Sequence, residues 1–225
     1  MAIVPGFLAS LRWIDISRPL GPATPVWPGD QPVEVEADRG TNEAGRVIEV
    51  RRLRLSLHAG THMDAPRHMV PEGAPVGGYP LSGCLQPARV VDAGASGMIT
   101  RDDVAGLAGP EAVLFRTRNV PPSDRFHTDF PGISPEAARH LAGCGVRLVG
   151  TDSPSVDPFE STELPAHHIL FGAGVYILEN LRLDHVSPGR YLLLLAPLPL
   201  AEAEASPVRP LLAPFGESAD LTGDR

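Results

Sequence analysis

The sequence predicts a mixed α/β fold with short strands and few helices. Its 225 residues include 25 prolines and 23 glycines, and these interrupt regular segments, so a helical bundle is not expected. Six short apolar runs are typical of strands, and two segments between them carry helix-capping signals. Hydrophobic residues make up 43% of the chain, enough to build a full core, and the length favours one domain over two.

The six predicted strands are each short, apolar and bounded by Gly, Pro, Asp or Ser. They cover residues 53–58, 88–93, 112–118, 146–152, 174–181 and 190–198. The last strand belongs to YLLLLAPLPLA, an apolar run that is too short and too rich in proline to cross a bilayer. We therefore expect a buried strand there.

Two helices are predicted in the middle of the chain. Thr100 can cap a helix that runs to about Leu107. Ser134 can cap a second helix, with Pro135 at its first position and Gly143 after its end. Because these helices alternate with strands while the two ends of the chain look all-β, we expect a mixed sheet rather than a regular Rossmann repeat.

Net charge and cysteine content limit the partners and the cellular compartment that can be expected for this protein. The net charge is −8 and the pI about 5.4, which argues against nucleic acid or a membrane surface as a partner. Cys84 and Cys144 lie far apart without a CxxC motif, so a reducing compartment is expected, although one bridge between them stays open. The first residues lack the regions of a signal peptide, and a cytoplasmic protein is the expectation.

One stretch concentrates residues that can bind a metal ion. HAGTHMDAPRH, residues 58–68, carries four of them at even positions: His58, His62, Asp64 and His68. In an extended segment side chains alternate, so all four can point to one side. Gly60 and Pro66 argue against a helix, and Gly60 permits a tight turn. We therefore expect an extended segment that leaves the strand 53–58 and converges on a metal.

The residue types indicate a catalytic metal. Two imidazoles and a carboxylate suit zinc and also manganese or iron, and three protein ligands with an open fourth position are typical of catalytic sites. Spacing alone leaves open which residues are ligands, and His68 can equally be a general acid or base. Polar residues in a surface turn are the alternative interpretation, which suits one histidine better than three with an aspartate. A serine hydrolase is not indicated, since no GxSxG motif occurs.

Residues in three other places are candidates for the metal site or the substrate pocket. His167 and His168 are adjacent, so on a strand at most one of them can be a ligand. Glu179 ends the apolar run VYIL, where an acid is costly unless it is paired or metal-bound; solvation at the strand end is an equally good explanation. Trp27 stands in a turn and either belongs to the core or lines a pocket for an aromatic substrate.

HAGTHMDAPRH resembles the HxGTHxDxPxH signature of the cyclase-like metal hydrolases. Further stretches are similar in order and spacing to the bacterial kynurenine formamidases of that family: WIDIS (13–17), TPVWPGD (24–30), GVRLVGTDSPSVDP (145–158), PAHH (165–168), ILENLRLDHVSPGRYLLLLAPLPL (177–200) and ASPVRPLL (205–212). The resemblance runs from about residue 12 to 213. A single domain over residues 1–225 is therefore expected, with a polar tail at 214–225.

The resemblance implies a homodimer with a swivelling β/β/α fold that hydrolyses N-formyl-L-kynurenine to L-kynurenine and formate in tryptophan degradation. It implies two zinc ions per subunit, with manganese or cobalt as alternatives. The implied ligands are His58, His62, Asp64, His167 and Glu179, with the two carboxylates bridging. His68 would be the catalytic acid and base, and Trp27 would line the substrate pocket. His167 is preferred to His168 because its offset from Glu179 fits the family pattern.

The sequence departs from the family pattern in two places, and two other functions compete with the implied one. The stretch EAGRVIEVRRLRLS, residues 43–56, carries more charge than is usual in the family, and Met69 stands where an aromatic residue is common. Both are expected to affect the substrate pocket rather than the metals. The nearest rival is a related hydrolase acting on isatin or another cyclic amide or lactone. A non-catalytic metal-binding module is a weaker one, because an acid/base residue beside an open metal position indicates catalysis.

Overall fold

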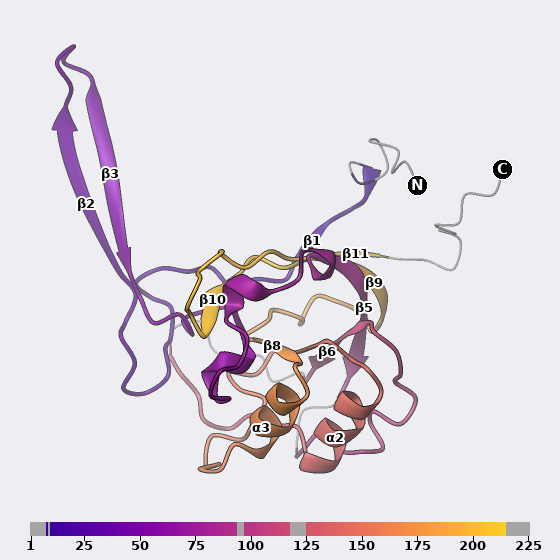
Figure 1. Ribbon diagram of the computed structural model, residues 1–225. Coiled ribbons are helices and arrows are strands. Elements are labelled where there is room, and N and C mark those ends of the chain that lie inside the picture. Colours follow the sequence, from indigo (N-terminus) through magenta and orange to yellow (C-terminus); the bar gives the residue numbers. More distant parts are fainter. Residues whose placement is uncertain (1–7, 9, 94–96, 118–124, 215–225) are drawn as a thin grey trace.

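The computed structural model describes residues 8, 10–93, 97–117 and 125–214. Apart from Pro214, the expected tail therefore lies outside the described residues. A mixed nine-stranded sheet forms the centre of the molecule, two helices pack below it in the view of Figure 1, and a two-stranded ribbon projects away from it. The mixed α/β fold that the sequence predicts is confirmed.

The strands of the large sheet lie in the order β1-β11-β9-β5-β6-β7-β8-β4-β10. Strands β5 to β8 are parallel to one another, and the other neighbouring strands pair antiparallel. The bounds are β1 Ile14–Asp15, β4 His62–Asp64, β5 Leu85–Asp92, β6 Ala112–Arg116, β7 Leu148–Thr151, β8 Tyr176–Glu179, β9 Gly189–Leu194, β10 Ala205–Pro207 and β11 Leu211–Pro214.

Two helices connect the parallel strands. Helix α2, Pro135–Gly143, follows β6, and helix α3, Pro165–Gly172, lies between β7 and β8. The second predicted helix is confirmed in α2, where the Ser134 hydroxyl accepts a hydrogen bond from the Ala137 amide. Helix α3 carries no such signal in the sequence, because its first flanking residue is Leu164, whose side chain cannot cap.

Both faces of the parallel strands are buried. Val113 and Phe115 of β6 pack with the helices in one apolar cluster, whereas Leu114 belongs to a second cluster on the opposite face. This double burial explains why the parallel strands appear in the sequence as continuous apolar runs. Five of the six predicted strands are accordingly found in β5 to β9 with shifted ends; Arg118, predicted as a strand residue, lies outside the described residues.

The predicted helix at residues 100–107 is wrong. The segment forms successive turns instead, although the Thr100 amide and hydroxyl both donate to Asp103 Oδ2 as in a capping box. The Ala105 amide bonds to the Asp102 carbonyl, an i to i+3 pattern that does not propagate. Gly106 and the Gly109-Pro110 pair leave too little chain to repay helix nucleation.

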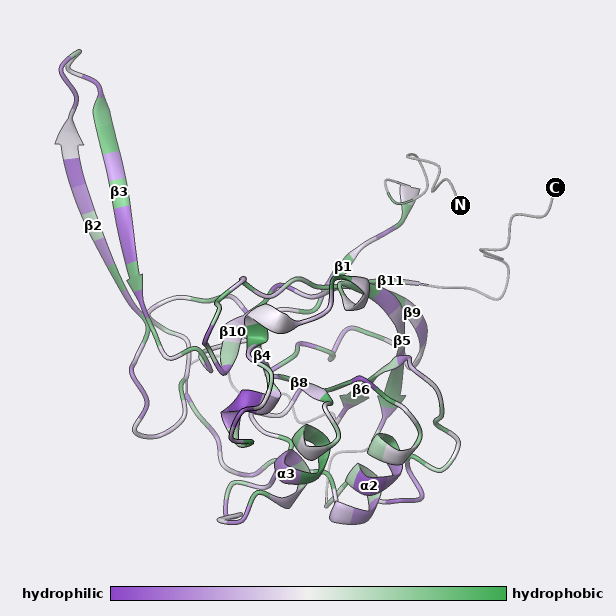
Figure 2. Ribbon diagram, viewed as in Figure 1, coloured by the Kyte–Doolittle hydropathy of each residue, from purple (hydrophilic) through white to green (hydrophobic). Residues whose placement is uncertain are grey.

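The predicted strand at residues 53–58 is wrong in its bounds. The strand is β3, Val47–Arg54, and it pairs antiparallel with β2, Glu34–Thr41, to form a ribbon that stands clear of the sheet (Figure 1). Nearly all of its residues are exposed, and charged and apolar residues are interspersed along it (Figure 2). The charged stretch 43–56 therefore builds this ribbon, and among the described residues it does not line the cavity described below.

Two smaller points concern the cysteines and the helices. Cys84 and Cys144 are both free, so no bridge joins them. Within the described ranges, no helix has the length and apolar character needed to span a bilayer.

Candidate metal centre

Two neighbouring antiparallel strands bring three predicted ligands together. His62 and Asp64 stand two residues apart on β4, so their side chains lie on one face. Glu179 ends β8, and the register places it directly opposite His62. His62 Nε2 lies 3.3 Å from Asp64 Oδ1 and 3.4 Å from Glu179 Oε2. All three residues are buried, and strand pairing alone therefore brings together three of the five predicted ligands.

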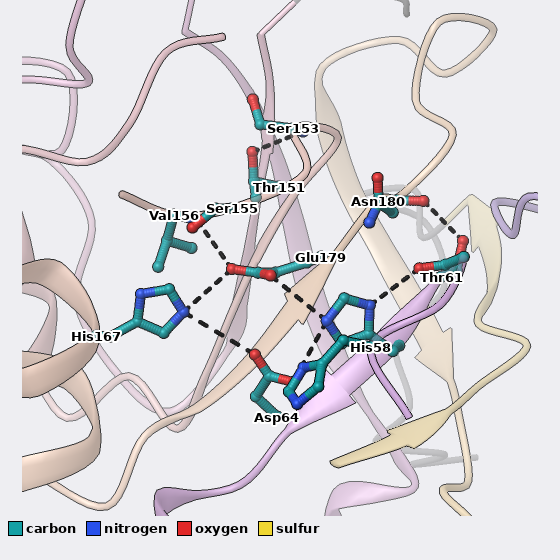
Figure 3. A network of polar contacts seen from close by, with 12 residues as sticks. His58, Thr61, Asp64, Thr151, Ser153, Ser155, Val156, His167, Glu179 and Asn180 are labelled. Carbon is teal, nitrogen blue, oxygen red and sulfur yellow. Dashed lines mark hydrogen bonds and ion pairs between the residues drawn. The ribbon is translucent and has the colours of Figure 1, made fainter. Parts of the chain in front are cut away.

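His58 reaches the centre from a turn rather than from an extended segment. Gly60 has a φ of 65°, a left-handed conformation that glycine adopts without strain, and it reverses the chain just before β4. His58 Nδ1 thereby lies 3.0 Å from Asp64 Oδ1 (Figure 3). The expectation of one extended segment with alternating side chains therefore holds only for His62 and Asp64.

His68 borders the same centre from the other side. It ends a short 3-10 helix, Pro66–His68, which begins directly after β4. Its ring centroid lies 4.5 Å from that of His58 and 6.2 Å from that of His167. The ring nitrogens of His58 and His68 and a carboxylate oxygen of Asp64 are close enough to share one cation, so this geometry also accommodates His68 as a ligand.

The adjacent histidines on α3 differ sharply. His167 is buried, and its Nε2 lies 3.3 Å from Glu179 Oε1 and 3.9 Å from Asp64 Oδ2 (Figure 3). His168 is exposed. On a helix, successive side chains diverge by about 100°, so only one of an adjacent pair faces a given site. The structure brings His167 to the cluster and leaves His168 outside it.

Several buried polar atoms at the centre have no hydrogen-bond partner among the described residues. They are His62 Nε2, Asp64 Oδ1 and Asp64 Oδ2. Buried polar atoms of this kind are costly, and a functional ligand is one of the few explanations. These atoms lie 3.0 to 3.9 Å from nitrogen or oxygen atoms of neighbouring side chains without forming a hydrogen bond, as expected for atoms that face a shared cation. The residues present therefore fit a metal ion.

The proton on His62 is placed by its neighbour. His62 Nδ1 lies 2.9 Å from the Gly60 carbonyl oxygen, which can only accept a hydrogen bond. Nδ1 must therefore carry the proton, and Nε2 presents its lone pair to the two carboxylates. This arrangement is typical of a histidine that binds a metal through Nε2.

The cluster binds protons tightly when no metal is present. Burial lowers the pKa of His58, but the charges of Asp64 and Glu179 outweigh it and raise this pKa to about 9. Burial likewise disfavours charge on His167, yet Asp157 and Glu179 raise its pKa to about 10. Protonated imidazoles thus supply the positive charge that a cation would otherwise bring, and metal binding must displace these protons.

His68 shows the opposite behaviour. Burial lowers its pKa, and the neighbouring His58 and His167 lower it further against the opposing effect of the carboxylates. A neutral imidazole results at physiological pH, and only a neutral imidazole can accept a proton. His68 is thus suited to proton transfer, in contrast to His58 and His167.

Trp27 lies in an aromatic cluster beside a large cavity. Its ring centroid is 5.2 Å from that of Phe126 and 5.1 Å from that of Phe159. Phe126 also lines a cavity of about 670 Å³, whose wall includes Gly60 and Asn180. Neither the five predicted ligands nor His68 line this cavity, but Gly60 and Asn180 are neighbours of the ligands in sequence. This cavity therefore adjoins the metal cluster rather than containing it.

The sequence analysis missed the residues that hold the distant ligands. Asp157 Oδ2 lies 2.7 Å from His167 Nδ1, and the Val156 amide donates to Glu179 Oε1 at 2.9 Å. Both belong to the DSPSVDP stretch, residues 152–158, which the sequence analysis used only as part of the family resemblance. A signal was present, since a loop with two acids and no basic residue is unusual inside a core.

The fold and this cluster of histidines and carboxylates are those expected of a hydrolase of the cyclase type. The family model described as "Putative cyclase" matches residues 14–158, and the chain belongs to this family. One curated relative is a protein named kynurenine formamidase from Salinibacter ruber. It is 45% identical over 203 residues, covering 88% of this chain and 96% of the relative.

Solved structures agree with this membership. A structure described as a potential metal-dependent hydrolase with cyclase activity is 33% identical with a TM-score of 0.78, covering 92% of this chain and 100% of the other. Isatin hydrolase A from Labrenzia aggregata, bound to benzyl benzoate, is 27% identical with a TM-score of 0.80, covering 94% of this chain and 97% of the other. The expected family resemblance is confirmed.

Proposed function

We propose that this protein is an arylformamidase that hydrolyses N-formyl-L-kynurenine to L-kynurenine and formate in tryptophan degradation. The observation that carries this proposal is the buried cluster of unsatisfied histidine and carboxylate atoms, in a chain 45% identical to a kynurenine formamidase over nearly its whole length. The proposed ligands are His58, His62, Asp64, His167 and Glu179.

The metal ligands, His68 and the aromatic residues have separate roles in amide hydrolysis. When bound, divalent ions at these ligands supply Lewis acidity and lower the pKa of coordinated water. Neutral His68 takes up the proton of the attacking water and passes it to the arylamine nitrogen as the carbon–nitrogen bond breaks. Formate and a free arylamine result. Trp27 and its phenylalanine neighbours offer an apolar surface for the aromatic ring of the substrate.

The proposed cofactor is two zinc ions per subunit. Imidazole and carboxylate ligands accept manganese or cobalt as well, so the native metal is a separate question. Asp64 belongs to both groups of side chains that could hold an ion, which supports a carboxylate shared between two metals. The cytoplasm is the proposed compartment, supported by two free cysteines; recovery of the native protein from a periplasmic extract would contradict it.

One sample can test the function and the cofactor together. Protein purified without added metal is expected to contain about two zinc ions per chain and to hydrolyse N-formyl-L-kynurenine with a kcat/KM at least about tenfold above that for isatin. Metal analysis and the two assays are run on the same preparation. Preference for isatin would support the rival function, hydrolysis of a cyclic amide. The similarity to isatin hydrolase A is the reason for testing this rival. Fully loaded protein that cleaves neither substrate would indicate a non-catalytic module.

We also propose a homodimer that forms through the ribbon of residues 34–54. A two-stranded ribbon without a hydrophobic partner is marginally stable in water, and both of its edges are open to further pairing. Val47, Val50 and Leu53 are 74%, 54% and 55% exposed, an unusual density of large apolar side chains on a projecting element. Burial against a second copy would cover them.

Charging the ribbon should therefore break the dimer. Val50 and Leu53 lie on opposite faces, so the double variant Val50→Lys/Leu53→Lys places a charge on each. We expect light scattering to show a mass near twice 23.9 kDa for the unaltered protein and near 23.9 kDa for the variant. Leu81→Lys, at an 88% exposed position outside the ribbon, is the matched control and should remain dimeric. A dimeric double variant would exclude the ribbon as the interface.

A further inference from the structure

One buried acid below the metal cluster has a role that the proposed hydrolysis does not assign. Asp157 is fully buried in the loop between β7 and α3, and each of its carboxylate oxygens is engaged. Oδ1 accepts a hydrogen bond from the Ala166 amide at 2.9 Å. Oδ2 accepts one from the His167 amide at 3.0 Å and faces His167 Nδ1 at 2.7 Å.

The two backbone bonds show that Asp157 caps helix α3 from a distance. The residue in the N-cap position, Leu164, has a φ of 46° and no side chain that could accept a hydrogen bond. The free amides of the first turn are satisfied by Asp157 instead, and its negative charge lies at the positive end of the helix. The start of α3 is thus fixed to the loop rather than to its own flanking residue.

The contact between Asp157 and His167 Nδ1 fixes the tautomer of the His167 imidazole. A carboxylate in contact with Nδ1 requires a proton on that atom, and Nε2 then directs its lone pair away from the helix. This atom is the one that lies 3.3 Å from Glu179 Oε1 and 3.9 Å from Asp64 Oδ2. With the proton on the other nitrogen, an N–H group would point into the centre and exclude a cation.

The same loop also holds the second distant ligand. The amide of Val156, the residue before Asp157, donates to Glu179 Oε1 at 2.9 Å (Figure 3). The Asn180 amide donates to the Ser153 carbonyl at 2.9 Å, which fixes the chain directly after Glu179. Residues 153–157 are all buried, so this support is rigid. One loop therefore sets the direction of both ligands that come from outside the signature stretch.

We propose that Asp157 is a positioning residue that acts through His167, fixing its tautomer and its Nε2 direction so that the centre binds metal tightly. The inference rests on the proposed function only in taking His167 as a ligand. It requires no particular substrate, and metal affinity measured without turnover tests it.

The first experiment compares zinc affinity in two backgrounds. Asp157→Asn keeps an oxygen for the helix amides but offers Nδ1 an N–H group, which reverses the tautomer. Competition with a chelator is expected to show a loss of about 10- to 100-fold in zinc affinity. In a His167→Ala background the same substitution should change the affinity less than about twofold. Equal losses in both backgrounds would show a merely structural role and overturn the proposal, as would an unchanged affinity in the single variant.

A matched control comes from the same loop. Asp152 is also a buried acid, and it accepts hydrogen bonds from the Thr117 amide and hydroxyl rather than from a predicted ligand. Asp152→Asn should leave zinc affinity within about twofold of the unaltered protein. A loss as large as that of Asp157→Asn would mean that any change in this loop disturbs the centre, and the specific role of Asp157 would be rejected.

A second measurement uses the unaltered protein, so it tests the role of Asp157 even if Asp157→Asn does not fold. In protein labelled with ¹⁵N-histidine and loaded with ¹¹³Cd, the metal should couple to Nε2 of His167, while Nδ1 carries a proton protected from exchange. Coupling through Nδ1 would overturn the role of Asp157. Coupling to neither nitrogen would remove His167 from the ligands and overturn the inference with it. Absence of formamidase activity, in contrast, would leave the Nε2 result standing.

Discussion

Replacing His68 by alanine is expected to lower kcat for N-formyl-L-kynurenine by about 10²- to 10⁴-fold while both metal ions stay bound. His68 lies beside the cluster, its lowered pKa keeps the imidazole neutral, and it comes from a 3-10 helix rather than from the paired strands. Loss of this side chain removes the group that carries the proton to the arylamine. Steady-state kinetics and metal analysis of the same preparation measure both quantities.

The same variant decides between two roles for His68. Its ring nitrogens can reach a cation shared with His58 and Asp64, so a ligand role is geometrically open. A drop in zinc content from about two ions to one per chain would assign His68 to the metal and reject it as the proton carrier. His140→Ala is a suitable control, because His140 lies on α2 and contacts only Cys144 among the side chains for which hydrogen bonds are described. It should alter neither kinetics nor metal content.

The signature stretch could be predicted well because its geometry is local. Alternation along a strand is a property of the backbone, so His62 and Asp64 had to share a face once the segment was extended. The turn at Gly60 was also expected from glycine. The effect of this turn on His58 was not expected. Because Gly60 is in a left-handed conformation, His58 does not continue the strand and approaches the cluster from a turn instead. Residue types therefore indicated a metal, while the path of the chain did not follow from alternation.

The distant residues depend on pairing that no local pattern contains. Glu179 meets His62 because β8 and β4 pair in one particular register, and this register follows from the fold as a whole. From the sequence alone, solvation at the strand end was an equally good explanation for an acid there. His167 could be preferred to His168 only through the resemblance, because no helix was predicted at residues 165–172, although Pro165 stands at its first position.

The ribbon was missed for a related reason. Strand prediction relies on a contrast between a buried and an exposed face, and both faces of β2 and β3 are exposed. Glu36 and Arg52, on neighbouring strands, are paired across the ribbon rather than buried. Only the last two residues of β3 fell within a predicted strand. A segment that is exposed on both faces therefore lacks the contrast from which a strand is predicted.

Replacing Asp64 by asparagine is expected to abolish metal binding altogether. Asp64 is the one side chain common to both groups that could hold an ion, and both of its oxygens are buried without a hydrogen-bond partner among the described residues. Asparagine has almost the same shape but carries no charge and offers one oxygen instead of two. Both proposed ions lose a ligand at once, and a neutral amide does not offset the cost of bringing cations into a buried site.

The loss can be followed without any substrate. Dialysis against zinc and metal analysis should give less than about a tenth of the unaltered content, and zinc should no longer raise the melting temperature, since a ligand stabilises only a protein that binds it. Glu204→Gln is the matched control: Glu204 Oε1 lies 3.5 Å from His58 Nε2, but its side chain is 40% exposed and it belongs to neither group. It should retain both ions. If Asp64→Asn still held two, Asp64 could not be the carboxylate that joins them, and the centre would have to be built on Glu179.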